Sequence, residues 1–169
     1  MKSKNSNNKN YPNLYWFTGQ AGAGKTTLAI LLKSKLEKEF LNKKFVILDG
    51  DEIRELFNNQ DYSKEGRLNN VAMVQNCCRF LIKNNIVPIV CMVSPFAEQR
   101  KEFCKEVDGV EIYVECDEIR GREHFHVDYY EKPTSTASEV WIEGKKILTI
   151  DTTNKKPNQA FKELWKQLS

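Results

Sequence analysis

The 169-residue sequence lacks several features that would point to a membrane or to nucleic acid. It has no apolar run near the roughly 18 residues that a membrane-spanning helix needs, so we expect no membrane partner. The net charge is only +3 and no long basic run occurs, so we expect no nucleic-acid partner either. Residues 1–10, MKSKNSNNKN, lack the apolar core of a signal peptide, and we expect a disordered tail there.

Disulfide and metal-site patterns are also lacking. The five cysteines are an odd number and cannot all pair. Cys91 and Cys116 lie in apolar, strand-like runs, where a free thiol behaves as a small hydrophobic group. Reduced cysteines predict a cytoplasmic protein. His124 and His126 could suggest a metal site with Asp128, but they fall in an aperiodic stretch, and we interpret them as surface or substrate-facing residues.

Short apolar runs typical of strands alternate with segments of helical periodicity along residues 11–169. We expect these residues to form a single domain. The pattern predicts an α/β three-layer sandwich, with a mostly parallel sheet and helices on both faces. The expected strands are 13–18, 44–49, 86–93 and 110–116, and the expected helices are 25–41, 51–57, 64–84, 95–107 and 158–168. Residues 139–151 could form a hairpin turning at Gly144 or one strand after a loop. Residues 117–138 show no period, and we expect a long functional loop or lid there.

A glycine-rich segment joins the first expected strand to the first expected helix. Its sequence, GQAGAGKT from Gly19 to Thr26, matches the phosphate-binding pattern G-x(4)-G-K-[ST] of P-loop NTPases in the correct strand-loop-helix context. Curled backbone N–H groups and the helix N-terminus would bind phosphate, Lys25 would reach the β- and γ-phosphates of ATP, and Thr26 would offer its hydroxyl to Mg²⁺. The alternative is an ordinary glycine-rich turn, although such a turn needs fewer glycines and no lysine. The expected ATP-binding residues are Gly19, Ala21, Gly22, Ala23, Gly24, Lys25, Thr26 and Thr27.

A second polar cluster, LDGDEIR, ends the second expected strand. Because the carboxyl ends of parallel strands share one edge, Asp49 and Asp51 should lie near the glycine loop. A carboxylate there could accept a proton from an attacking hydroxyl or hold metal-bound water, and Arg54 could reach a substrate anion. We predict Asp51 and Lys25 to be catalytic. The alternative for Asp51 is a helix N-cap before EIREL.

Four segments in this order resemble the adenylylsulfate kinase family: FTGQAGAGKTTLA, LDGDEIR, YSKEGRLNNVAMV and SPF. The glycine loop alone is common to many NTPases, whereas the four segments in this order are not. The likeness runs from about residue 13 to 116 and returns over the last strand and helix. Members of this family are P-loop kinases that transfer the γ-phosphoryl of MgATP to the ribose 3′-hydroxyl of a nucleotide with a substituted 5′-phosphate. The resemblance therefore implies a small-molecule nucleotide as the partner.

The resemblance also implies an acceptor site. By its motifs, Tyr62 would stack on the acceptor base, while Arg54, Arg67 and Asn70 would hold the anionic 5′ end. Tyr62 could instead be loop packing, and Arg67 and Asn70 a solvated helix face. The full expected substrate-binding set is Asp49, Asp51, Arg54, Tyr62, Arg67, Asn70, Ser94, Pro95 and Phe96. In the shortened lid, Arg122 is the candidate that matches the family's ATP-binding arginine.

Departures from the family pattern fall where the acceptor would bind. Ala72, Met73 and Ala97 stand where the family has arginines, Gln99 replaces an acid, and Arg100 is retained. The basic lid has shrunk to residues 121–133, and its lysine has no counterpart. A less cationic lid suits a less anionic group than sulfate. The chain thus resembles the variant of this family that phosphorylates cytidine diphosphoramidate, in making the phosphoramidate decoration of bacterial capsules.

Three readings of function remain open. The first is a kinase acting on cytidine diphosphoramidate, the second is an adenylylsulfate kinase of sulfate activation, and the third is a non-catalytic nucleotide-binding module. Mere ATP binding needs neither Asp51 nor Arg54, and their presence argues against the third. Either kinase could be a homodimer.

Overall fold

The structure is a computed structural model that describes residues 11–117, 141–142 and 145–169. The helices of this part of the chain are α1 (Lys25–Glu39), α2 (Gly50–Leu56), α3 (Lys64–Lys83), α4 (Ala97–Val107) and α5 (Pro157–Leu168). The strands are β1 (Leu14–Thr18), β2 (Lys44–Asp49), β3 (Ile86–Cys91), β4 (Gly109–Glu115), β5 (Trp141–Ile142), β6 (Lys145–Lys146) and β7 (Leu148–Asp151).

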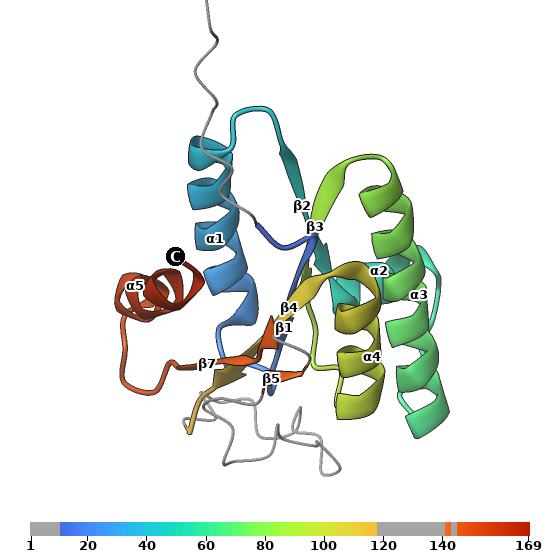
Figure 1. The fold of residues 1–169 in the computed structure, drawn as a ribbon. Coiled ribbons are helices and arrows are strands. Elements are labelled where there is room, and N and C mark those ends of the chain that lie inside the picture. The colour runs from blue at the N-terminus through green and yellow to red at the C-terminus, as the bar shows by residue number, and fades with distance from the viewer. Residues whose placement is uncertain (1–10, 118–140, 143–144) are drawn as a thin grey trace, which may run out of the picture.

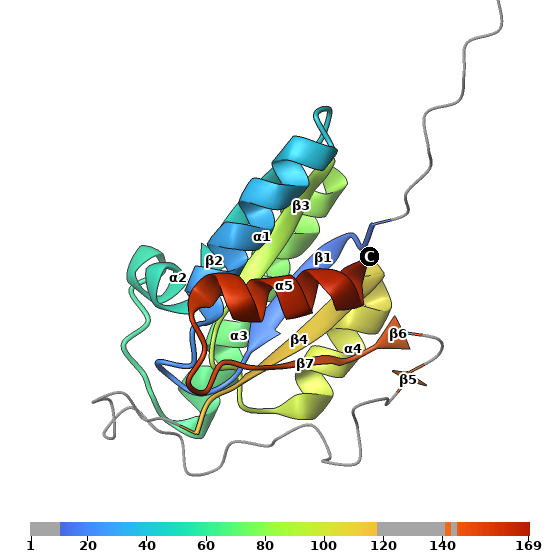
Figure 2. The same ribbon diagram turned by 90° about the vertical axis from the view of Figure 1, so that its left-hand side faces the viewer.

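Five strands form one sheet in the order β2-β3-β1-β4-β7, and each neighbouring pair is parallel. Helices cover both faces: α1 and α5 lie on one side of the sheet, and α3 and α4 on the other (Figure 1). In Figure 2 the viewer looks onto the side of α1 and α5. The predicted three-layer α/β fold is confirmed. Because the strands are parallel, their carboxyl ends gather at one edge, where ligands bind in such sheets.

The period-two geometry of β1 divides its side chains between two cores. Tyr15 and Phe17 face the core beneath α1 and α5, whereas Leu14 and Trp16 face the core beneath α3 and α4. All four are at most 2% exposed. Packing on both faces holds β1 firmly in place. The position at which the loop after Thr18 begins is therefore well defined.

Residues 139–151 combine the two alternatives that their sequence left open. β5 and β6 pair antiparallel, as a hairpin would, and β7 then joins the main sheet beside β4. Gly144, the expected turn, lies outside the described residues, as do residues 1–10 and nearly all of the expected lid at 117–138.

Helix α4 begins at Ala97, two residues later than expected. Ser94 has a φ of 31°, and Phe96 is still extended, so residues 94–96 form a turn rather than a first helical turn. The five cysteines are free thiols, as predicted. None of the described helices combines the length and the apolar character needed to cross a bilayer.

Candidate active site

The glycine loop leaves β1 through backbone conformations that favour glycine. Gly19, Gly22 and Gly24 have φ values of 140°, 78° and 96°. A Cβ atom on Gly19 would lie 2.2 Å from the carbonyl oxygen of Val114, so the loop passes too close to β4 for any side chain there. Gly24 is the N-cap of α1, which directs the unpaired N–H groups of that helix at the loop. The geometry is that of an anion-binding nest.

Lys25 is held inside this loop. Its side chain is buried, with the residue 9% exposed, and Nζ donates to the carbonyl oxygens of Gly19 at 2.9 Å and Gln20 at 2.8 Å. The ammonium group therefore lies where the loop closes on itself. This position of Nζ fits the phosphate-binding role predicted from the motif spacing. The role itself stays a prediction.

Asp49 occupies a position between the loop and α2. One of its carboxylate oxygens accepts from the Asp51 backbone N–H, and the other accepts from the Thr26 hydroxyl, each at 3.0 Å. The helix cap is thus Asp49, and the alternative that Asp51 caps the helix is wrong. The reason is that α2 already begins at Gly50, so the residue before it is Asp49. Gly50 packs closely on Met92, because a Cβ on Gly50 would lie 2.6 Å from the Met92 Cβ.

Thr26 and Asp49 suit a hard divalent cation. They present a hydroxyl and a carboxylate, joined by their own hydrogen bond, at the exit of the phosphate loop. Mg²⁺ prefers such oxygen ligands together with substrate phosphates and water. Only Thr26 was predicted as a metal ligand, and the pairing adds Asp49. Over the described residues there is no group of three His, Cys, Asp or Glu side chains that could hold a metal, and His124 and His126 lie outside them.

Arg54 organises the segment between α2 and α3. It is 8% exposed, and Nη1 donates to the carbonyl oxygens of Asn59 at 3.2 Å and Asp61 at 2.8 Å. Its guanidinium lies 4.3 Å from the centre of the Tyr62 ring, and that of Arg67 lies 5.6 Å away. Burial lowers the pKa of Arg54 from its usual value, but arginine stays charged in proteins. The Tyr62 ring itself is exposed, so it can meet a base.

Asn70 and the residues after β3 complete the opposite wall. The Asn70 amide nitrogen donates to the Gly50 carbonyl oxygen at 3.2 Å, which joins α3 to the start of α2. Ser94 is buried, and its hydroxyl oxygen accepts from the Trp16 indole N–H at 3.0 Å. This bond fastens Ser94 to β1, the strand that leads into the glycine loop.

These elements enclose one cavity of about 520 Å³. It brings together the loop residues and nearly all of the predicted acceptor residues. Its lining includes Ala21, Gly22, Gly24, Lys25, Thr26, Thr27, Asp49, Asp51, Arg54, Tyr62, Arg67, Asn70, Ser94 and Pro95. Gly19, Ala23 and Phe96 do not line it. Phe96 is half-buried, and the Lys64 ammonium lies over its ring, 5.4 Å from the ring centre. Arg122 lies outside the described residues.

A second cavity of about 320 Å³ lies across the loop and shares Gly24 and Thr27 with the first. Its other wall is the segment between β7 and α5, including Thr152, Lys155 and Pro157. The Thr152 hydroxyl donates to the Ala23 carbonyl oxygen at 2.8 Å and so fastens this segment to the phosphate loop. The sequence predictions missed these residues, although the segment follows a strand whose carboxyl end had to lie at the same edge.

The sequence profile of the adenylylsulphate kinase family matches residues 12–158. The chain belongs to the adenylylsulphate kinase family. It is 36% identical over 110 residues to the cytidine diphosphoramidate kinase of Campylobacter jejuni, covering 64% of each chain. It is 41% identical over 101 residues to a probable adenylyl-sulfate kinase of Pyrococcus abyssi, covering 59% of this chain and 57% of that one. The aligned segments thus span less than two thirds of these members of the adenylylsulphate kinase family.

A solved member of the adenylylsulphate kinase family has the same fold. It is the Mycobacterium tuberculosis APS kinase in complex with AMPPNP and APS, and it superimposes with a TM-score of 0.73. At 20% identity the superposition covers 94% of this chain and 98% of that one. The fold and the family are therefore established, while the matches to differently named relatives leave the acceptor open.

Proposed function

We propose that the protein transfers the γ-phosphoryl group of ATP to the ribose 3′-hydroxyl of a nucleotide that carries a further group on its 5′-phosphate. The observation that carries this proposal is the 520 Å³ cavity, because it joins the phosphate loop to the predicted acceptor residues in one space. A module that only bound ATP would need the loop but not the wall formed by Arg54, Tyr62 and Arg67.

Each group then has a distinct task in the transfer. The loop amides and Lys25 hold the donor phosphates and offset the charge of the moving phosphoryl group. Thr26 and Asp49 would hold Mg²⁺, which supplies further neutralisation of phosphate charge when it is bound. Asp51, exposed at the first turn of α2, orients or deprotonates the acceptor hydroxyl.

The donor nucleotide would extend from the loop into the second cavity. The cavity touches the loop at Gly24 and Thr27, and Pro157 and Ala160 give it apolar surface suited to a base. The acceptor would lie on the opposite side of the loop, with its base against Tyr62. Arginine faces and aromatic rings both stack on bases, so the exposed ring can exchange its contact with Arg54 for a base.

For the acceptor itself we propose cytidine diphosphoramidate, in capsule phosphoramidate biosynthesis. The support is the loss of cationic side chains at 72, 73 and 97 while Arg54 and Arg67 remain, together with the similarity to the Campylobacter enzyme. Adenylyl sulfate is the second candidate, favoured by the similarity to the Pyrococcus protein. A cytoplasmic location and a homodimer remain predictions.

An acceptor comparison tests the proposal. With MgATP and a coupled ADP readout, we expect cytidine diphosphoramidate to be phosphorylated at least about tenfold more efficiently than adenylyl sulfate, a difference of about 1.4 kcal/mol. Equal or better turnover of adenylyl sulfate would make the protein a short-lid adenylylsulfate kinase. If ADP forms with neither acceptor, the nucleotide-binding module is the remaining interpretation.

A further inference from the structure

Behind the cavity, Arg100 of α4 and Glu111 of β4 form an ion pair in the interior. Their side chains are 0% and 3% exposed, and Arg100 Nε lies 2.7 Å from Glu111 Oε1. Two charges removed from water are costly to bury, and apolar side chains of similar volume often serve stability as well or better. Neither residue lines the cavity. The pair therefore needs a reason beyond stability.

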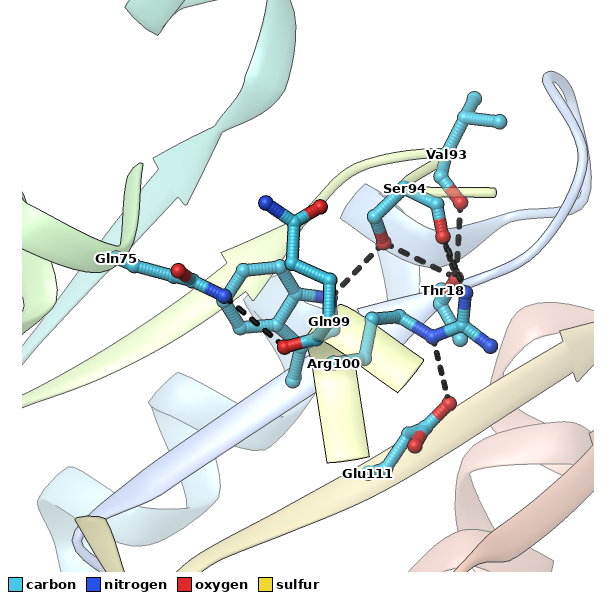
Figure 3. Close-up of polar contacts among 8 residues, drawn as sticks. Thr18, Gln75, Val93, Ser94, Gln99, Arg100 and Glu111 are labelled. Carbon is cyan, nitrogen blue, oxygen red and sulfur yellow. Dashed lines mark hydrogen bonds and ion pairs between the residues drawn. The ribbon is translucent and has the colours of Figure 1, made fainter. Parts of the chain in front are cut away.

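The second arm of the Arg100 guanidinium points to such a reason. Its Nη1 donates to the backbone carbonyl oxygen of Ser94, so that Arg100 lies between Glu111 and the turn after β3 (Figure 3). Ser94 has a φ of 31°, in the left-handed region, and it precedes Pro95, which favours extended backbone. Such a conformation persists only where the surroundings impose it.

The side chain of Ser94 is fixed from the other direction. Its hydroxyl accepts from the Trp16 indole at 3.0 Å and donates to the Thr18 hydroxyl at 3.2 Å, and Thr18 donates to the Val93 carbonyl oxygen at 2.9 Å. Trp16 and Thr18 belong to β1, the strand that leads directly into the phosphate loop. The turn at Ser94 is thus held to β1, which leads into the phosphate loop, and through Arg100 it is held to α4 and β4.

We propose that Arg100, oriented by Glu111, is a positioning residue that holds the Ser94–Pro95 wall of the cavity in place for the acceptor nucleotide. The inference rests on the proposed function for its effect on catalysis. Arg100 touches neither substrate. It acts through the Ser94 carbonyl oxygen, and a planar fork with donors on two sides is the group that can hold a carboxylate and a carbonyl oxygen at once.

A second arginine–glutamate pair provides a matched comparison. Arg79 of α3 and Glu106 of α4 make two hydrogen bonds of 2.7 Å, but both side chains are exposed and neither lines the cavity. This pair joins α3 to α4, as does the bond from the Gln75 amide to the Gln99 carbonyl oxygen at 3.1 Å (Figure 3). Removing the exposed pair should leave the turn unaffected.

The test replaces the buried pair as a whole, in the double variant Arg100→Met with Glu111→Leu. An apolar pair keeps the interior filled and leaves no unpaired charge, so the variant should fold with an unfolding midpoint near that of the wild type. The Ser94 carbonyl oxygen then loses the Arg100 guanidinium and keeps the longer bond from the Thr18 hydroxyl, at 3.5 Å. We expect the KM for the acceptor to rise by about tenfold to a hundredfold, as small misplacements do, while the KM for ATP is unchanged.

A readout without catalysis accompanies the kinetics. The indole N–H of Trp16 reports on Ser94 by NMR, and a Trp16→Phe variant assigns its signal. We expect this signal to shift in the Arg100–Glu111 double variant, while the Trp165 signal stays in place. The control double variant, Arg79→Met with Glu106→Leu, should leave both KM values unchanged. Its control value lies in the kinetics alone, because Arg79 lies 4.9 Å from the centre of the Phe103 ring, which packs edge-on against Trp16.

The outcomes separate the two proposals. An unshifted Trp16 signal with an unchanged acceptor KM would overturn the positioning role, and so would an equal rise in both KM values. If the wild type transfers no phosphoryl group to any acceptor, the proposed function fails, but the Trp16 signal still decides whether the pair holds the turn. Should the double variant not fold, Arg100→Lys decides: a single ammonium keeps the charge but lacks the fork, so the signal should still shift and the acceptor KM still rise.

Discussion

At the scale of single residues, the site depends on a few charged groups whose surroundings differ. Lys25 is nearly enclosed by the loop that it closes, whereas Asp51 is exposed at the cavity. Asp49 has three roles: it caps α2, it accepts a hydrogen bond from the Thr26 hydroxyl, and it is a candidate metal ligand. Substitutions of Lys25 and Asp51 should therefore have different effects on the transfer reaction.

Lys25→Ala should abolish most phosphoryl transfer and leave the fold intact. Loss of one well-placed charge in an enclosed site lowers the rate by about 10²–10³. The measurement is kcat with MgATP and the preferred acceptor, with the unfolding midpoint as the check on folding. Lys33→Ala, farther along α1 where Lys33 forms an ion pair with Glu37 at 2.9 Å, is the control. A folded Lys25→Ala protein with near-normal activity would remove Lys25 from the phosphate site.

Asp51→Asn should lower kcat by about 10²–10⁴, the usual contribution of a general base, with little change in the KM for ATP. The amide preserves shape but cannot take a proton. Because Asp49 provides the helix cap, the substitution should leave stability nearly unchanged. Glu52→Gln, the exposed acidic neighbour outside the cavity lining, serves as the control. A normal kcat in Asp51→Asn would require a different base.

Residue spacing was enough to predict the phosphate loop, because its glycines and lysine must stand at fixed intervals. Asp51 was predicted to be catalytic, with a helix cap as its alternative. The cap is Asp49, because α2 begins at Gly50, and the helical pattern from residue 51 onward did not show that earlier start. Arg100 and Glu111 carry no sequence signal of burial either, as charged residues in a helix and a strand normally face water.

At the scale of elements, the cavity wall that carries the predicted acceptor residues combines side chains of α2 and α3 with two connections. The segment between α2 and α3 is held by Arg54 through the Asn59 and Asp61 carbonyl oxygens, and it presents Tyr62. The turn between β3 and α4 presents Ser94 and Pro95. Periodicity placed the flanking helices and strands, but connections have no period, so their conformations could not be predicted.

Tyr62→Ala should weaken acceptor binding by about 1–3 kcal/mol, the usual worth of a base stacked on an aromatic ring, and leave ATP binding nearly unchanged. The measurement is the dissociation constant of each nucleotide by calorimetry. Phe57→Ala is the matched control, since Phe57 is another exposed ring at the end of α2 but outside the cavity lining. Equal losses for ATP and acceptor would argue that Tyr62 supports the segment rather than the base.

At the scale of the whole molecule, the parallel sheet is what brings distant residues together. The loop after β1, Asp49 at the end of β2 and Ser94 after β3 meet because these strands lie side by side and point the same way. Alternating helices and strands predicted that layered arrangement and the shared edge. The order of the strands, and with it the second cavity beside Thr152, depends on contacts between segments far apart in the chain, which no local pattern records.

The central claim is that one cavity holds both the ATP phosphates and an acceptor whose 3′-hydroxyl oxygen attacks the γ-phosphorus of ATP. ADP then leaves, and the phosphoryl group ends on the 3′-oxygen. The most direct measurement is transfer of label from γ-labelled ATP to the preferred acceptor, compared with the same acceptor lacking its 3′-hydroxyl. We predict stoichiometric label on the 3′-oxygen of the first and none on the second, although the second should still bind. Label on the 3′-deoxy acceptor, or ADP formation with no label on either, would contradict the account.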